Sequence, residues 1–399
     1  MFISEKARNI SSSLTLAVDA KAKLMKKEGH NIIGFGAGEP DFDTPEYIKL
    51  AAISAINQGF TKYTPVGGIE ELKTAISNYF EEEIGIKYTS NQIMVSNGAK
   101  QCIYNALYCL IDQGDKVLIP SPYWVSYPEM VKLCGGISIF VPTTENNSFM
   151  LKAETLEKYI DEKTKVIIIN SPNNPCGSVY SEQDLEQIAE LAVKNNLFVI
   201  SDEIYDKLIY DGLKHVSIAT CENMLERTLL INGASKSFAM TGWRIGFAAG
   251  PTQLIEAMEN FQSHSTSNPN SIAQKASVEA LTNLAKKDET ISKMVNEFSE
   301  RRTYMVKRIN KMKSLSCNLP KGAFYVFMNI SGTFNKQYAG RIINNSTDFA
   351  EILLENYNVA VIPGIAFGAD DYIRLSYATS MENIKIGLDR IEEFVSALK

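Results

Sequence analysis

The alternation of short apolar runs with helical stretches between residues 93 and 262 is the feature that most constrains the fold. The apolar runs are 93–95, 117–119, 137–141, 166–169, 198–200, 228–231 and 245–248, and the helical stretches are 99–111, 124–133, 181–195 and 252–262. Continuous apolar strands that alternate with helices are typical of a mostly parallel sheet with both faces covered. We therefore expect an α/β fold whose large domain holds a mostly parallel, seven-stranded sheet.

The chain of 399 residues has room for a second, smaller domain. Residues 270–312 have the pattern of long, charged amphipathic helices, and the remainder mixes strands at 323–330, 359–362 and 372–377 with helices. We assign residues 46–290 to the large domain and residues 291–399 to a small α+β domain. Residues 1–45 begin with an arm and continue as a helix and a short strand.

Composition narrows the class of protein. Hydrophobic residues make up 45% and charged residues 22% of the chain, as in ordinary soluble globular proteins. The net charge of −6 argues against nucleic acid as a partner, because phosphate binding needs clustered positive charge. The chain has neither a membrane-spanning apolar run nor a signal peptide pattern. The six cysteines form no CxxC pair, so we expect no metal site, reduced thiols and a cytoplasmic location.

One lysine stands in a collar of small residues just after the apolar run 228–231. The segment is Ile231-Asn232-Gly233-Ala234-Ser235-Lys236-Ser237, and Arg244 follows eight residues after the lysine. Small neighbours leave room for a flat ligand, and a lysine held away from water loses its proton readily, as a Schiff-base lysine must. Taken alone, a Ser-Lys pair is more often an ordinary surface turn with an ordinary lysine.

Polar residues also follow the other expected strands, where ligands gather in open α/β sheets. Each of these polar segments also has an ordinary structural explanation. It could be a plain helix start, a core tryptophan, a solvated loop or an arginine on an edge strand. The segments are Asn97-Gly98-Ala99-Lys100, Pro120-Ser121-Pro122-Tyr123-Trp124, Ser171-Pro172-Asn173-Asn174-Pro175-Cys176-Gly177, Ser201-Asp202-Glu203-Ile204-Tyr205 and Tyr372-Ile373-Arg374-Leu375-Ser376-Tyr377.

Together these segments resemble class I aminotransferases, which use pyridoxal phosphate (PLP), and within them the bacterial branch of aspartate aminotransferases. The matches keep the family's order from Gly36 to Tyr377. The resemblance implies transfer of an amino group from aspartate or glutamate to a 2-oxo acid such as 2-oxoglutarate through a PLP Schiff base. Some members of this branch also accept prephenate. It further implies that the small domain includes part of the N-terminal stretch, and that the enzyme is a homodimer.

The resemblance assigns a role to each motif. Lys236 would carry the cofactor and move the proton, Asp202 would face the pyridine nitrogen, and Tyr205 would bond the ring's 3-oxygen. The other expected cofactor-binding residues are Gly98, Ala99, Lys100, Trp124, Asn174, Ser235, Arg244 and, from the partner subunit, Tyr63. Arg374, Gly38, Asn174 and Trp124 would hold the substrate, with Lys100 and Thr15 at the distal carboxylate of an acidic substrate.

Three points remain open in the sequence. Many relatives have a hydroxyl residue three positions before the lysine, where this chain has Gly233, so Ser235 or Ser237 would take its place at the phosphate. We expect cis peptide bonds at Asn174-Pro175 and at Ser121-Pro122. The alternative functions are an aromatic or alanine aminotransferase and, further off, a PLP-dependent carbon–sulfur lyase or a non-catalytic PLP-sensing regulator.

Overall fold

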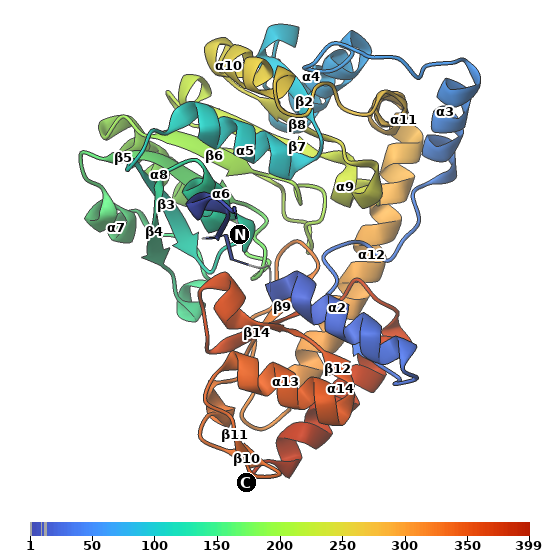
Figure 1. Ribbon diagram of the computed structural model, residues 1–399, viewed down its shortest axis with the longest axis vertical. Coiled ribbons are helices and arrows are strands. Elements are labelled where there is room, and N and C mark those ends of the chain that lie inside the picture. Colours follow the sequence, from blue (N-terminus) through green and yellow to red (C-terminus); the bar gives the residue numbers. More distant parts are fainter. Residues whose placement is uncertain (1, 9, 12–13) are drawn as a thin grey trace.

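The computed structural model describes residues 2–8, 10–11 and 14–399, and its largest sheet has seven strands (Figure 1). The strand order is β2-β8-β7-β6-β5-β3-β4, in which β8 is antiparallel to both of its neighbours and every other pair is parallel. The strands are β2 (Ile93–Ser96), β3 (Lys116–Ser121), β4 (Ile137–Pro142), β5 (Thr164–Asn170), β6 (Phe198–Asp202), β7 (Thr228–Gly233) and β8 (Gly246–Ala249). The expected mostly parallel α/β sheet is confirmed.

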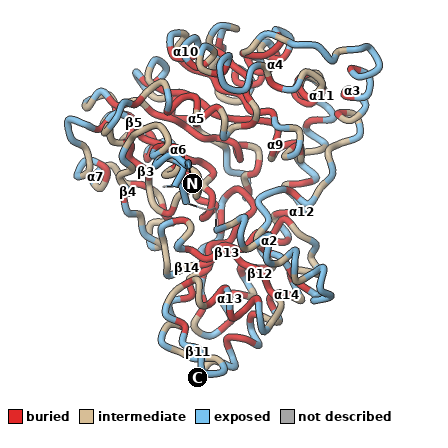
Figure 2. The backbone as a smooth tube through the Cα atoms, viewed as in Figure 1, coloured by how far each residue is buried: buried red, intermediate tan, exposed pale blue. Residues whose placement is uncertain are grey.

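Helices cover both faces of this sheet because its central strands are apolar on both sides. In β5, Val166 and Ile168 belong to one hydrophobic cluster, whereas Ile167 and Ile169 belong to another on the opposite face. The first cluster is closed by α5 (Ala99–Leu110), α6 (Ser126–Leu133) and α10 (Thr252–Ser263), and the second by α7 (Ala153–Leu156) and α8 (Glu182–Lys194). Burial is accordingly concentrated along the strands (Figure 2).

A third group of helices packs beyond β2 and leads out of the large sheet. It contains α3 (Glu46–Asn57), α4 (Glu70–Ile84) and α11 (Ser271–Thr282). The following helix, α12 (Leu284–Ile309), is 26 residues long and contacts both α11 and the C-terminal helix α14 (Met381–Ala397). Figure 1 shows α12 running from the upper part of the molecule into the lower part.

The lower part is built around an antiparallel sheet of three strands, β13 (Ile362–Pro363), β14 (Tyr372–Ser376) and β9 (Tyr325–Asn329). The N-terminal stretch joins it, because β1 (Ile33–Gly34) pairs with β12 (Val359–Ala360) and α2 (Leu14–Lys27) contacts β12 and β13. The other elements here are α13 (Ser346–Tyr357), β10 (Gln337–Tyr338) and β11 (Arg341–Ile342). The division at 45 and 290 stays a proposal, and its second boundary falls inside α12.

The proline-containing loops and the N-terminal arm differ in part from what the sequence predicts. Ser121-Pro122 is cis as expected, but Asn174-Pro175 is not, and the cis bond of that loop lies at Ser171-Pro172 instead. The expected N-terminal arm contains the short helix α1 (Glu5–Arg8), and its positions 1, 9, 12 and 13 lie outside the described residues. In the described part of the chain, no helix combines the length and apolarity needed to cross a membrane.

Candidate active site

A cavity of about 450 Å³ lies where the carboxyl ends of β5, β6 and β7 meet α2 and β14. Asn170 and Asp202 end two of the strands, and Lys236 follows the third in the short helix α9 (Ala234–Ser237). Parallel strands bring such end positions to one edge of the sheet, so residues far apart in sequence share one cavity. Arg374 enters from β14, and Thr15 from α2 covers another side.

Lys236 faces the cavity from a tightly packed turn. A side chain on Gly233 would lie 2.9 Å from the carbonyl oxygen of Ile245 and 3.0 Å from Cα of Gly246, so the backbone packed against Gly233 leaves no room for a hydroxyl side chain there without a shift. The Lys236 ammonium donates to the carbonyl oxygen of Gly38 at 2.5 Å. Burial lowers the pKa of Lys236 to about 8, although the carboxylate of Glu39 opposes this shift. The amine is therefore far more available for covalent chemistry than an exposed lysine.

Asp202 is the buried carboxylate of the cavity. Its Oδ2 accepts a hydrogen bond from the Tyr127 hydroxyl at 2.6 Å, and its Oδ1 accepts the backbone N–H of Ile204 at 3.3 Å. Burial raises the pKa of Asp202 to about 6, and the bond from Tyr127 acts in the opposite direction. A carboxylate in this setting lacks a full counter-charge, so a cation placed opposite it would be stabilised.

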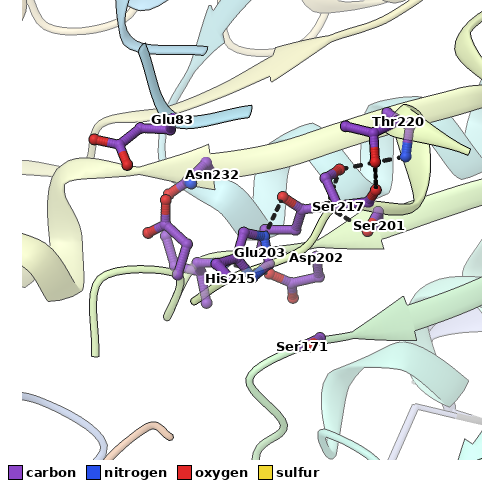
Figure 3. A network of polar contacts seen from close by, with 12 residues as sticks. Glu83, Ser171, Ser201, Asp202, Glu203, His215, Ser217, Thr220 and Asn232 are labelled. Atoms are coloured by element: carbon purple, nitrogen blue, oxygen red, sulfur yellow. Dashed lines mark hydrogen bonds and ion pairs between the residues drawn. The ribbon is translucent and has the colours of Figure 1, made fainter. Parts of the chain in front are cut away.

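A polar network fixes the backbone next to Asp202 (Figure 3). The Glu203 carboxylate accepts hydrogen bonds from Ser201 and Ser217 at 2.8 and 2.7 Å, and its other oxygen lies 2.7 Å from Nε2 of His215. Burial lowers the pKa of His215, but the carboxylates of Glu203 and Asp206 outweigh it and the net shift is upward. The contact between Glu203 and His215 thus holds the loop after β6 against the end of that strand.

Tyr205 and Arg374 belong to one contact group on the other side of the cavity. The hydroxyl of Tyr205 lies 3.0 Å from that of Tyr325, and the guanidinium of Arg374 lies over the Tyr325 ring at 4.3 Å. Arg374 donates to Oδ1 of Asn174 at 3.0 Å and to the carbonyl oxygen of Gly36 at 2.9 Å. Since Oδ1 of Asn174 is taken by Arg374, its amide nitrogen is the atom available to donate into the cavity.

Positive charge and backbone N–H groups gather at a third side. Gly98, with φ of +92°, precedes α5, whose first N–H groups have no partner within the helix. A side chain on Gly98 would lie 2.3 Å from Nη2 of Arg244. The side chains of Lys100, Ser235 and Arg244 line the cavity here. Burial and the charge of Arg244 lower the pKa of Lys100, whose ammonium lies 5.0 Å from the centre of the Trp124 ring. An anion would bind at this end.

Comparison with known proteins agrees with this geometry. The family model described as aminotransferase class I and II matches residues 30–391. The chain is 44% identical to an aspartate aminotransferase of Bacillus subtilis, with 99% of each chain covered. It is 46% identical to a probable aspartate/prephenate aminotransferase of Rhizobium leguminosarum, with full coverage of both. A crystal structure of the Rhizobium meliloti aspartate aminotransferase superposes with a TM-score of 0.96 at 42% identity over the whole of both chains.

The chain belongs to the class I and II aminotransferase family. In this aminotransferase the cavity is lined by most of the residues that the sequence singled out. Gly98 does not line it but packs against the guanidinium of Arg244, which does. The lining residues among them are Thr15, Gly38, Ala99, Lys100, Trp124, Asn174, Asp202, Tyr205, Ser235, Lys236, Arg244 and Arg374. Of the two serines left open, Ser235 lines the cavity, whereas Ser237 is buried outside its lining.

Tyr63, which is expected to act in the partner subunit, lies outside the cavity of its own chain, and several lining residues were not singled out from the sequence. Tyr63 is 92% exposed. Sequence reasoning missed Tyr127, Tyr325 and Glu39, which all line the cavity or contact a residue that does. For Tyr127 a signal existed, because it follows Trp124 by three residues within the helix expected over 124–133, and residues three apart share a helix face. In the structure α6 begins only at Ser126, so Trp124 lies just before it. Tyr325 and Glu39 have no local signal of this kind.

Proposed function

We propose that this enzyme is a PLP-dependent aspartate aminotransferase, which moves the amino group of L-aspartate to a 2-oxo acid such as 2-oxoglutarate. The observation that carries the proposal is one cavity in which a lysine of lowered pKa, a buried carboxylate and a buried arginine face one another. Aspartate and aspartate/prephenate aminotransferases among the relatives support the choice of substrate.

The residues of the cavity fit PLP in charge and in shape. The anion-binding end formed by α5, Ser235 and Arg244 suits a phosphate, and Gly98 leaves the space that Arg244 needs. Asp202 suits a protonated pyridine nitrogen, Tyr205 and Asn174 suit the 3-oxygen, and the Trp124 ring suits a planar heterocycle. When bound, PLP supplies a carbonyl carbon that takes up the amino group and a ring that withdraws electrons from the substrate.

The chain's own residues would divide the remaining work. Arg374 holds the substrate α-carboxylate through its guanidinium, and Asn174 keeps Arg374 in place. Lys236 Nζ takes the proton from the substrate Cα, because its lowered pKa leaves a useful fraction of the amine neutral near pH 7. Asp202 keeps the ring nitrogen protonated, and the hydrogen bond from Tyr127 keeps Asp202 ionised.

The choice of an acidic substrate rests on Lys100. A second carboxylate needs a cation or donors once it is enclosed, because an unpaired charge is costly. Lys100 lines the cavity beside the Trp124 ring, and Thr15 lines it from α2. The alternative is that Lys100 binds the phosphate together with Arg244, whose charge lowers the pKa of Lys100. In that case an aromatic or alanine aminotransferase would fit the same cavity. The use of prephenate as a substrate stays a prediction.

A homodimer completes the proposal. Tyr63 cannot serve a phosphate in its own chain, because it lies outside the cavity. Shortly before Tyr63 in the sequence, α3 exposes Leu50, Ile53 and Ile56, which recur every three residues and therefore share one helix face. An exposed apolar face of this kind is typical of a protein–protein contact. α3 lies at the outer edge of the molecule (Figure 1), and all three side chains are exposed. Cytoplasmic location stays a prediction.

The proposal is tested by following amino transfer with the purified enzyme and added PLP. We expect L-aspartate and 2-oxoglutarate to yield oxaloacetate and glutamate, with Lys236→Ala as the inactive control. Parallel assays with phenylalanine, alanine and prephenate rank the alternatives. Preference for phenylalanine or alanine over aspartate would overturn the substrate assignment, and absence of any amino transfer would overturn the reaction.

A further inference from the structure

Tyr325 is a fully buried residue that lines the cavity and has no role in the mechanism so far. It is the first residue of β9, which pairs with β14, the strand that carries Arg374. Its hydroxyl and its ring contact different residues. The hydroxyl lies 3.0 Å from the hydroxyl of Tyr205, and the ring centre lies 4.3 Å from the guanidinium carbon of Arg374. One side chain therefore touches both the expected cofactor contact and the expected carboxylate contact.

The hydroxyl pair has a definite direction once Tyr205 donates into the cavity. Burial raises the pKa of both phenols, so each keeps its single proton at neutral pH. A hydroxyl donates one hydrogen bond and accepts up to two. If Tyr205 donates to a ligand oxygen, Tyr325 must be the donor within the pair. Hydrogen bonds in such a chain polarise one another, so donation from Tyr325 makes Tyr205 a better donor.

The ring acts on Arg374 in a separate way. Arg374 is 3% exposed, and no ion pair within the described residues neutralises it. Its guanidinium instead lies near two aromatic rings, those of Tyr325 and Phe367 at 4.3 and 5.0 Å. Its Nε is buried and has no hydrogen-bond partner in the described part of the chain. The aromatic faces hold the plane of the guanidinium and leave a donor for an incoming carboxylate.

We propose that Tyr325 is a positioning residue whose hydroxyl holds Tyr205 as a donor to the cofactor's 3-oxygen and whose ring holds Arg374 for the substrate carboxylate. The inference deepens the proposed function and rests on it. Tyr325 thereby links the cofactor end of the cavity to the substrate end. Because the two contacts use different atoms of one side chain, substitutions can separate them.

The test uses Tyr325→Phe, Tyr325→Leu, Tyr205→Phe and the double variant Tyr205→Phe/Tyr325→Phe in the PLP-loaded enzyme. The first readout is the pH midpoint at which the absorption of the bound cofactor changes. Weaker donation leaves more negative charge on the 3-oxygen, which retains the neighbouring proton on Lys236 Nζ to higher pH. We expect an upward shift for Tyr205→Phe and a shift of roughly 0.1–0.6 pH units for Tyr325→Phe, a fraction of one charge-assisted hydrogen bond. The double variant should match Tyr205→Phe alone.

The second readout is the dissociation constant of succinate, a dicarboxylate that cannot react. Tyr325→Phe keeps the ring and should bind succinate within about twofold of the parent enzyme. Tyr325→Leu removes the ring and should weaken binding roughly 5- to 30-fold, as expected for a desolvated cation–π contact. Circular dichroism and the melting temperature check that each variant is folded, and Tyr325→Phe still tests the hydroxyl if Tyr325→Leu is not.

The outcomes separate the two contacts from the function on which they rest. The role of the Tyr325 hydroxyl would be overturned by an unchanged pH midpoint in Tyr325→Phe. It would also be overturned if Tyr325→Phe shifted the midpoint equally in the parent enzyme and in Tyr205→Phe. Unchanged succinate binding in Tyr325→Leu would overturn the role of its ring. A parent enzyme that takes up no PLP would contradict the proposed function itself, because the reference spectrum would then be missing.

Discussion

The Tyr127 hydroxyl donates a 2.6 Å hydrogen bond to Oδ2 of Asp202, and both side chains are buried. This bond joins α6 to the end of β6 and acts on a buried carboxylate that lines the candidate cofactor site. Burial already raises the pKa of Asp202 to about 6, and without the bond from Tyr127 this pKa would be higher still. Tyr127 therefore helps to keep Asp202 ionised at neutral pH.

Replacement of Tyr127 by phenylalanine should reduce turnover and change its pH dependence. Loss of a hydrogen bond to a charged group costs about 1.5–3 kcal/mol, or roughly 10- to 150-fold in kcat. Because the pKa of Asp202 rises in this variant, the acidic limb of the pH–rate profile should move to higher pH. Tyr123→Phe is a matched control, since Tyr123 stacks on Phe140 outside the cavity lining. An unchanged acidic limb would contradict the role of Tyr127.

Covalent capture of PLP by the cofactor-free enzyme should depend on the pKa of Lys236. Only the neutral amine is a nucleophile, so the capture rate should rise with pH and level off above about pH 8. At pH 7 the neutral fraction is roughly 300 times that of a lysine with a pKa of 10.5. Borohydride reduction followed by peptide mapping should find the cofactor on Lys236. Attachment to another lysine would refute the assignment.

The same pKa predicts that Lys236 destabilises the cofactor-free fold. Its folded-state pKa of about 8 lies below the unfolded value of 10.5, so the folded state binds fewer protons between these values and stability rises with pH in that window. At pH 7 the protonated amine costs on the order of 3 kcal/mol. Lys236→Met should therefore melt at a higher temperature than the parent apoenzyme at pH 7, with little difference near pH 10.5. Equal melting curves at pH 7 would argue against this cost.

Substitution of Lys100 by serine should separate acidic from aromatic substrates. If Lys100 holds the distal carboxylate, kcat/KM for aspartate should fall by roughly 1–3 kcal/mol, or about 5- to 150-fold. Aromatic substrates lack that charge and should change much less. Equal losses for aspartate and phenylalanine would assign Lys100 to the phosphate, and the preference for aspartate would then depend on the relatives alone.

Charge placed on the exposed face of α3 should break the proposed dimer. Ile53→Arg should give monomers in sedimentation at assay concentration and lower activity, because Tyr63 could no longer reach the partner's cavity. Tyr63→Phe should remain dimeric and lose only the contact of its hydroxyl with phosphate, seen as weaker PLP binding. A fully active monomer of the parent enzyme would rule out a shared site.

The sequence by itself determined the sheet, and with the family resemblance it singled out half of the residues that line the cavity. Strands buried on both faces are continuous apolar runs, and residues just after parallel strands meet at one edge, so Asp202 and Lys236 could be brought together without coordinates. The local pattern left two serines, Ser235 and Ser237, as candidates for the contact with the phosphate. The bacterial aspartate aminotransferase resemblance supplied the roles of Arg374 and Tyr63, which spacing does not encode.

Only the tertiary structure decided which side chains support those residues. Tyr205 and Tyr325 are 120 positions apart, and Arg374 bonds the carbonyl oxygen of Gly36 from 338 positions away. Such contacts depend on how β9, β14 and the N-terminal stretch pack against the large sheet, and no periodicity within a segment records that packing. The position of Ser235 in the cavity lining, without Ser237, and the cis bond at Ser171-Pro172 were decided in the same way, because backbone direction in a loop depends on what the loop packs against.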